Sequence, residues 1–204
     1  MSEDIVLKII LLGASTVGKT SIFLRYFQDE FSSKSLTTVG VDFKTKFFKI
    51  EGKKIKVNYI DTAGQEKFRS ISENYLKGTD GVILVFDVTN RETLELVDDW
   101  AECIKNNNNR ENIGKILFGN KVDLDEKRKV DYNEGKDLAD KLDCEYYEGS
   151  AKTGENINFI MNEIAKNSYY EWKKTEEMRV SIRLSSVSFE PKTKMKKRNC
   201  CKSK

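Results

Sequence analysis

Short apolar runs alternate along this chain with segments whose apolar residues recur every three or four positions. The apolar runs predict β-strands over residues 5–12, 44–50, 54–60, 81–87, 115–120 and 144–148. The periodic segments predict helices over residues 19–27, 71–77, 91–106, 132–142 and 155–172. Because strands and helices alternate, we expect an α/β fold with a mostly parallel, doubly wound sheet of six strands and helices on both faces.

The pattern also predicts which strands lie inside the sheet and which lie at its edge. Residues 82–86 are all apolar, which indicates a central strand buried on both faces. Residues 44–50 and 54–60 partly alternate, and Glu51, Gly52 and Lys53 between them favour a hairpin turn. We therefore expect one antiparallel pair at an edge of the sheet.

A glycine-rich segment, the phosphate cradle at residues 13–20, follows the first predicted strand. It reads Gly13-Ala14-Ser15-Thr16-Val17-Gly18-Lys19-Thr20, which is the pattern G-x-x-x-x-G-K-[ST]. The glycines let successive N–H groups point at an anion, the lysine can reach terminal phosphates, and the threonine hydroxyl can ligate Mg²⁺. The cradle predicts a magnesium-chelated nucleoside triphosphate, with an ordinary helix-capping turn as the alternative.

A second motif, Asp61-Thr62-Ala63-Gly64-Gln65, follows the third predicted strand at the same edge of the sheet. Asp61 can hold Mg²⁺ through a water molecule, and Gly64 has no side chain to keep its N–H from a γ-phosphate. Gln65 can orient the attacking water. The position of the motif behind the cradle favours this interpretation over a plain solvated turn.

Two later segments predict the choice of base. In Asn120-Lys121-Val122-Asp123, the aspartate can accept hydrogen bonds from N1–H and the 2-amino group of guanine, donors that adenine lacks in that arrangement. Lys121 can lie across the ring, and Asn120 can tie this segment to the cradle. In Ser150-Ala151-Lys152, the Ala151 N–H can meet guanine O6. Each segment alone also makes an ordinary polar turn.

Together and in this order, the four motifs resemble the Ras superfamily of small GTPases over residues 5–172. Residues 38–43, 67–71 and 84–89 and the terminal cysteine pair look like its Rab branch. The resemblance implies a single P-loop G domain at residues 1–172 that binds GTP or GDP with Mg²⁺. It implies that the nucleotide is bound by Ser15, Thr16, Val17, Gly18, Lys19, Thr20, Ser21, Phe31, Thr38, Gly64, Asn120, Lys121, Asp123, Ser150, Ala151 and Lys152.

The same resemblance implies roles for particular residues. Thr38 would join Thr20 and Asp61 around Mg²⁺ and contact the γ-phosphate in a first switch, while Phe31 would stack beside the ribose or base. Gln65, with Lys19 and Gly64, would carry slow GTP hydrolysis. Three residues depart from the usual Rab pattern: Ile60 replaces a tryptophan, Lys67 an arginine, and Thr16 a frequent glycine.

The resemblance further implies a monomeric switch in vesicle trafficking, which cycles between the cytosol and the cytoplasmic face of an intracellular membrane. Its partners would be an exchange factor, a GTPase-activating protein, a GDP-dissociation inhibitor or escort protein, and effectors. Two other classes stay open. A P-loop ATPase or nucleotide kinase is disfavoured by Asp123, and a GTP-binding scaffold with little hydrolysis is kept open by Thr16.

Composition restricts the chemistry and singles out the C-terminus. The 204 residues contain no histidine, which excludes Ser-His-Asp and Cys-His catalysis and His-ligated zinc. The four cysteines show no metal-ligand spacing, which fits a reducing intracellular setting. The net charge is +3, of which residues 173–204 carry +8, leaving −5 on residues 1–172. A nucleic-acid-binding body would be basic, so we expect no nucleic-acid partner.

Residues 173–204 are predicted to form a flexible basic tail. Cys200 and Cys201 stand together near its end, among lysines and one arginine. Adjacent cysteines at a basic terminus suit lipidation combined with attraction to an anionic membrane leaflet. The resemblance to Rab proteins favours geranylgeranylation of both cysteines. A myristoylation signal is not expected, because Ser2 stands where glycine is required.

Overall fold

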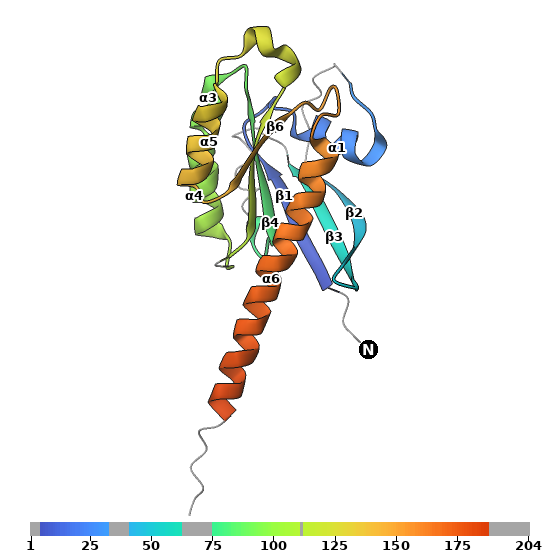
Figure 1. Ribbon diagram of the computed structural model, residues 1–204, viewed down its shortest axis with the longest axis vertical. Coiled ribbons are helices and arrows are strands. Elements are labelled where there is room, and N and C mark those ends of the chain that lie inside the picture. Colours follow the sequence, from blue (N-terminus) through green and yellow to red (C-terminus); the bar gives the residue numbers. More distant parts are fainter. Residues whose placement is uncertain (1–4, 33–40, 63–74, 111, 188–204) are drawn as a thin grey trace, which may run out of the picture.

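The computed structural model describes residues 5–32, 41–62, 75–110 and 112–187 (Figure 1). Its centre is a six-stranded sheet in the order β2-β3-β1-β4-β5-β6. The strands are β1 (Ile5–Leu12), β2 (Val41–Ile50), β3 (Lys53–Thr62), β4 (Gly81–Asp87), β5 (Gly114–Asn120) and β6 (Glu145–Gly149). Only β2 and β3 pair antiparallel among these strands, at one edge, as the sequence predicts.

Helices cover both faces of the sheet (Figure 1). The helices are α1 (Lys19–Gln28), α3 (Arg91–Glu95), α4 (Val97–Asn107), α5 (Tyr132–Lys141) and α6 (Ile157–Val187). Helices α1 and α6 share one apolar core with alternate residues of the strands, such as Ile83 and Val85 of β4. The residues between them, such as Leu84 and Phe86, share the other core with α3, α4 and α5. The prediction that β4 is buried on both faces is confirmed.

The segment predicted as one helix over residues 91–106 is two helices. Helix α3 ends at Glu95 and α4 begins at Val97, with Leu96 between them. The apolar face continues across this junction, since Leu94, Val97, Trp100 and Ile104 are all buried in one cluster. Because the apolar periodicity runs through Leu96, it could not show the break.

Helix α6 is longer than the sequence predicts. Its expected end at Trp172 is wrong, because the helix runs to Val187. The apolar periodicity fades because this last part leaves the domain (Figure 1), with Met178 and Val180 more than half exposed. Ion pairs one turn apart, Lys174 with Glu171 and Arg179 with Glu176, support it instead.

The remaining predictions have mixed outcomes. A short 3₁₀ helix at Val122–Lys127 was not predicted. The helix expected over residues 71–77 lies mostly outside the described residues. No helix in the described part of the chain combines the length and apolar character needed to cross a membrane.

Candidate nucleotide-binding site

The predicted motifs meet at one edge of the sheet. In the strand register, Asp61 on β3 lies opposite Leu11 near the end of β1. Asn120, the last residue of β5, lies opposite Gly149, the last of β6. The loops that follow β1, β5 and β6 therefore leave the sheet beside the end of β3. The strand order changes direction beside β1, and open α/β sheets bind ligands at the carboxyl ends around such a point.

The backbone of the cradle requires its two glycines. Gly13 has φ 147°, and a Cβ atom there would lie 2.1 Å from the Val85 carbonyl oxygen. Gly18 has φ 101°, and a Cβ atom there would lie 2.3 Å from Asn120 Nδ2. Helix α1 begins directly after Gly18, and no side chain in the described residues caps this end. A helix N-terminus without a side-chain cap suits an anion.

Lys19 is buried inside the cradle, with 4% of its surface exposed. Its Nζ donates hydrogen bonds to the carbonyl oxygens of Gly13 and Ala14, each at 2.8 Å. An ammonium group has three donors, so one remains for a further acceptor. Burial lowers the pKa of Lys19 to about 8, an effect that the negative charge of Asp61 opposes. Because a desolvated cation gains from a nearby anion, this position suits a phosphate.

Asp61 and Thr20 form the second part of the site. The Thr20 hydroxyl donates to Asp61 Oδ2 at 2.7 Å. Asp61 is fully buried, and burial raises its pKa to about 6, against the opposing effects of the Thr20 hydrogen bond and the Lys19 charge. Its other oxygen, Oδ1, has no hydrogen-bond partner among the described residues. A buried carboxylate oxygen and a hydroxyl are the hard ligands that Mg²⁺ prefers, so the residues present fit a magnesium ion.

The segment at residues 120–123, which is predicted to recognise the base, is bonded to the cradle by two neighbouring side chains. Asn120 is 1% exposed, and its Nδ2 donates to the Val17 carbonyl oxygen at 2.8 Å. Lys121 Nζ donates to the Thr16 carbonyl oxygen at 2.8 Å and lies 2.6 Å from Asp87. The phosphate end and the base end are thus one connected unit.

Asp123 is held by the loop that follows β6. Its Oδ1 accepts a hydrogen bond from the Ser150 hydroxyl at 2.6 Å, and its Oδ2 lies 3.3 Å from Lys152 Nζ. The Ser150 oxygen in turn accepts from the backbone N–H groups of Lys152 and Thr153. A fixed carboxylate of this kind can accept two parallel hydrogen bonds from a base edge. The Ala151 N–H donates to Asn120 Oδ1 at 3.0 Å, so a contact to guanine O6 requires sharing this donor.

Comparison with known proteins decides the family. The family model described as Ras family matches residues 8–170. Similar proteins include Ras-related protein RABC2b of Arabidopsis thaliana, 45% identical over 163 residues, which are 79% of each chain. GTP-binding protein ypt2 of Schizosaccharomyces pombe is 40% identical over 77% of this chain and 78% of its own. Ras-related protein SEC4 of Candida albicans is 39% identical over 85% and 81%.

The chain belongs to the Rab branch of the Ras family. It is therefore a small GTPase, which binds guanine nucleotide and hydrolyses GTP. The predicted α/β fold of this family, with one antiparallel pair in a mostly parallel sheet, is confirmed.

Several predicted site residues of this Rab GTPase cannot be placed. Thr38, Gly64, Gln65, Cys200 and Cys201 lie outside the described residues, as does Lys67. Phe31 is described and is 38% exposed. Ser15 and Ser21, on either side of the cradle's lysine, are partly buried. The roles expected of all these residues remain predictions.

Two departures from the Rab pattern now have a structural description. Thr16 has φ 65°, in the left-handed region where a β-branched residue is a strained outlier, and its side chain is exposed. The threonine therefore changes the backbone energy of the cradle without crowding its interior. Ile60 is buried in the core, opposite the exposed Phe43 on β2.

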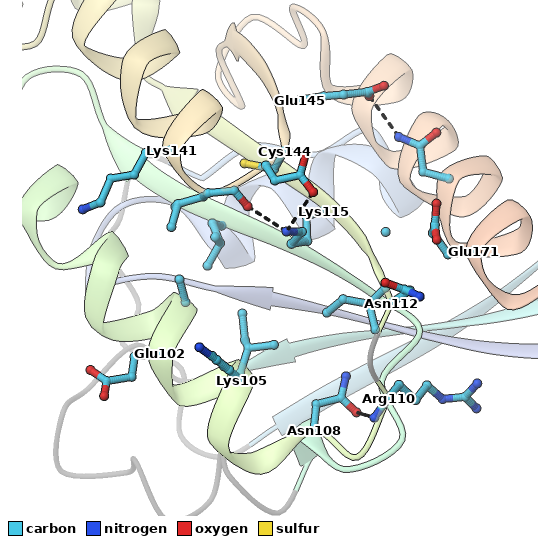
Figure 2. A pocket seen from close by; sticks show the side chains of 18 of the residues that line it. Glu102, Lys105, Asn108, Arg110, Asn112, Lys115, Lys141, Cys144, Glu145 and Glu171 are labelled. Carbon is cyan, nitrogen blue, oxygen red and sulfur yellow. Dashed lines mark hydrogen bonds and ion pairs between the residues drawn. The ribbon is translucent and has the colours of Figure 1, made fainter. Parts of the chain in front are cut away.

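A groove of about 1490 Å³ lies at the opposite end of the sheet, between α4, α5, α6 and the start of β5 (Figure 2). Many of its charged groups already have partners. Lys141 pairs with Asp98, Lys115 Nζ donates to the Leu142 carbonyl oxygen at 2.7 Å, and Glu145 accepts from Asn167. Size alone therefore does not mark the functional end of this GTPase.

One contact at the functional end has no counterpart in the sequence motifs. Arg25 of α1 donates hydrogen bonds to the carbonyl oxygens of Ala151 and Lys152. A single arginine on an amphipathic helix carries no sequence signal of such a role. Only the fold brings it to this loop.

Proposed function

We propose that this Rab GTPase is a slow, membrane-attached switch in vesicle trafficking that recruits effectors while GTP is bound. The observation that carries the proposal is one connected cluster at the carboxyl edge of the sheet. Through Asn120 it connects the cradle, with the buried Lys19 beside Asp61, to the loop that holds Asp123, to which we assign the selection of guanine. A triphosphate lying between these ends would contact all of them.

Hydrolysis would depend on positioning and electrostatics. Phosphoryl transfer to water passes through a loose transition state, with charge on the oxygens of the transferred group. Lys19 and the N–H groups that open α1 would face this charge, while Gln65 would orient the attacking water and Gly64 would donate its N–H. Mg²⁺, held by Thr20, Thr38 and Asp61, would neutralise charge on the β- and γ-phosphates when bound. No histidine is required.

The intrinsic reaction would be slow because this set contains no arginine directed at the transferred group. A GTPase-activating protein can supply one, which accelerates hydrolysis by about 10⁵-fold, or about 7 kcal/mol of barrier. An exchange factor would reload GTP, and effectors would recognise the GTP-bound state. These partners follow from the family. The regions around residues 36–43 and 64–76 would form the two switches.

The C-terminal tail would attach the switch to an intracellular membrane. Prenyl groups on Cys200 and Cys201, next to a polybasic segment, give the two signals that stable anchoring requires. A GDP-dissociation inhibitor or escort protein would carry the lipidated form through the cytosol. We place the G domain at residues 1–172 and the tail at 173–204, with residues 173–187 as its helical first part.

Single-turnover GTP hydrolysis by the Gln65→Leu variant tests the proposed switch. We expect slower hydrolysis with unchanged GTP affinity, because the glutamine acts on water and not on the nucleotide. Wild-type protein that binds GTP tightly but shows no measurable hydrolysis, alone or with a GTPase-activating protein, would support the alternative of a GTP-binding scaffold. An unchanged rate in the variant would remove Gln65 from the mechanism.

The intact mass of protein recovered from native membranes tests the tail. Wild-type protein should carry prenyl additions that disappear in Cys200→Ser/Cys201→Ser, together with membrane binding. Membrane binding that survives the double substitution would contradict lipid anchoring through these cysteines.

A further inference from the structure

Arg25 makes more main-chain contacts than its place on a helix surface requires. It lies in α1, between the cradle and the end of the helix. Nε donates to the Ala151 carbonyl oxygen at 3.0 Å, and Nη2 donates to that of Lys152 at 2.8 Å. Nη1 donates to the backbone oxygen of Asp29 at 3.0 Å and to its carboxylate at 2.9 Å. Every nitrogen of the guanidinium group is thus engaged.

The loop that accepts hydrogen bonds from Arg25 contains Ala151 and contacts Asp123, the two residues that we assign to the base. The carbonyl oxygens of Ala151 and Lys152 accept from Arg25, while other polar groups of the loop have other partners. The Ala151 N–H reaches Asn120, and Ser150 and Lys152 reach Asp123. Arg25 thus connects this loop to α1 by two hydrogen bonds, beside the apolar contact that Ala151 makes in the core shared with α1.

Arg25 makes its second set of contacts, with Asp29, at the end of α1. Asp29 closes the helix in the left-handed conformation, with φ 55° and its N–H bonded to the Arg25 carbonyl oxygen. The chain then continues to Phe31 and the first switch region. One guanidinium group thus joins the loop after β6 to the point where the chain leaves α1.

Geometry, and not charge alone, explains these contacts. The planar fork of arginine presents several donors in fixed directions, which a lysine ammonium cannot reproduce. The ion pair with Asp29 contributes little, because that carboxylate is 90% exposed. The Arg25 side chain itself is only 19% exposed, so its bonds to the loop carbonyls are partly shielded from water.

We propose that Arg25 is a positioning residue that sets the retention of guanine nucleotide by fixing the Ala151–Lys152 loop against α1. It touches neither base nor phosphate in this role and acts through Asp123 and Ala151. The inference rests on the proposed assignment of these two residues to the base. Without the fork, the loop separates more readily from α1, Asp123 loses its fixed position, and the nucleotide leaves faster.

The test compares release rates of GDP and IDP, which lacks the 2-amino group that Asp123 would accept from. Full-length wild type, Arg25→Ala and Arg25→Lys are loaded with each nucleotide in excess Mg²⁺. We expect Arg25→Ala to release GDP about tenfold faster, the effect of losing charged hydrogen bonds. The ratio of IDP to GDP release rates should fall toward one. Arg25→Lys should resemble the alanine variant, because charge without the fork is insufficient.

Arg91→Ala is the matched control. Arg91 also donates to a backbone carbonyl, that of Lys129, and pairs with Glu134, but it lies at the start of α3, away from the base loop. Its GDP release and its IDP-to-GDP ratio should equal those of wild type. The melting temperature of each GDP-loaded variant separates loss of the loop contact from general destabilisation. If Arg25→Ala does not fold, Arg25→Lys decides the question on the same two readouts.

The outcomes separate the inference from the proposed function. If wild type releases IDP and GDP equally, Asp123 does not read the 2-amino group and the base assignment fails. If wild type discriminates and the Arg25 variants release both nucleotides as wild type does, the role of Arg25 is wrong. Wild-type behaviour of Arg25→Lys alone would also overturn the claim, since charge would then suffice.

Discussion

Each end of the sheet in this Rab GTPase has one buried aspartate, and burial raises the pKa of both. The two carboxylates have different partners. Asp80, directly before β4, accepts from the Lys8 N–H at 2.9 Å, and its Oδ1 lies 2.9 Å from the Arg110 guanidinium group. Asp61, at the other end, has the Thr20 hydroxyl on one oxygen, and no basic side chain in the described residues forms an ion pair with it. Asp80 is neutralised within the chain. Asp61 has no ion pair among the described residues, which is consistent with the magnesium ion that we propose there.

The lysines at the two ends show the same contrast. Lys19 and Lys115 each donate to main-chain carbonyl oxygens, but Lys19 is 4% exposed inside the cradle and the Lys115 side chain is 31% exposed at the edge of a wide groove. In this groove several charged groups are paired with one another or with main-chain oxygens. Among the described residues the buried carboxylate of Asp80 has an ion pair and that of Asp61 has none, and this difference distinguishes the functional end.

The largest expected effect comes from removing the two lysines in turn. Lys19→Ala should weaken GTP binding by about 1000-fold, because it removes a buried cation that the phosphates would contact. Lys115→Ala removes a lysine–carbonyl contact of similar length and should leave GTP affinity unchanged. Titration calorimetry with GTP and Mg²⁺ measures both. Equal losses of GTP affinity in the two variants would contradict the proposed difference between the two ends.

The next largest effect should be a difference in stability between glycine substitutions at the two ends. Gly13→Ala should lower the free energy of unfolding by more than about 3 kcal/mol, since Cβ would overlap the Val85 carbonyl and the positive φ would add strain. Gly52, in the hairpin at the other end, also has positive φ but open space around it. Gly52→Ala should therefore cost only about 1 kcal/mol. Urea unfolding of the GDP-loaded proteins measures both, and a small effect at Gly13 would mean that the cradle backbone can shift.

The two aspartates should separate in their response to magnesium. Asp61→Asn should raise the Mg²⁺ concentration needed to slow GDP release by about tenfold to a hundredfold, an effect comparable to loss of a metal-supporting partner. Asp80→Asn should leave that concentration unchanged and lower stability, because Arg110 loses its partner. GDP release measured over a magnesium series tests this. An unchanged magnesium response in Asp61→Asn would exclude it from the metal site.

The smallest effect concerns the contact between the hairpin and α6. Glu51 accepts from Lys173 at 2.7 Å and from Tyr169 at 3.1 Å, and the Lys173 hydrogen bond lowers the pKa of Glu51. A carboxyl group whose pKa is lowered by folding stabilises the fold above its unfolded pKa, and this stabilisation disappears as pH falls through the folded pKa. Glu51→Gln should therefore be slightly less stable than wild type at pH 7, and the difference should vanish in acid. Urea unfolding across this pH range measures it, and a difference that grows in acid would contradict the assignment.

Much of the fold could be predicted from the sequence because burial leaves a pattern in it. The bounds predicted for β1 and β4 agree with the structure, since β4 is an unbroken apolar run buried on both faces and β1 is an apolar run interrupted only by Lys8. The extension of α6 could not be predicted in this way, because a helix that leaves the domain needs no apolar face. The break at Leu96 was hidden for the opposite reason, since the apolar face continues across it.

The residues of the candidate site also divide into those that the sequence could predict and those that it could not. Gly13, Lys19, Asp61 and Asp123 could be named because each stands in a motif after a predicted strand. Arg25 could not, since its contacts with the loop after β6 join residues 126 and 127 positions apart. Such a contact depends on the packing of α1 against that loop, which no local pattern encodes.

The choice of base tests the central claim most directly. Asp123→Asn replaces two acceptor oxygens with one acceptor and one amide donor, so it should lose guanine and gain xanthine, whose 2-oxo group accepts a hydrogen bond. Competition of GTP and XTP for wild type and variant measures this preference. We predict that wild type prefers GTP and that the variant prefers XTP. A variant that binds GTP as tightly as wild type would contradict the account of this edge of the sheet as a guanine-nucleotide site.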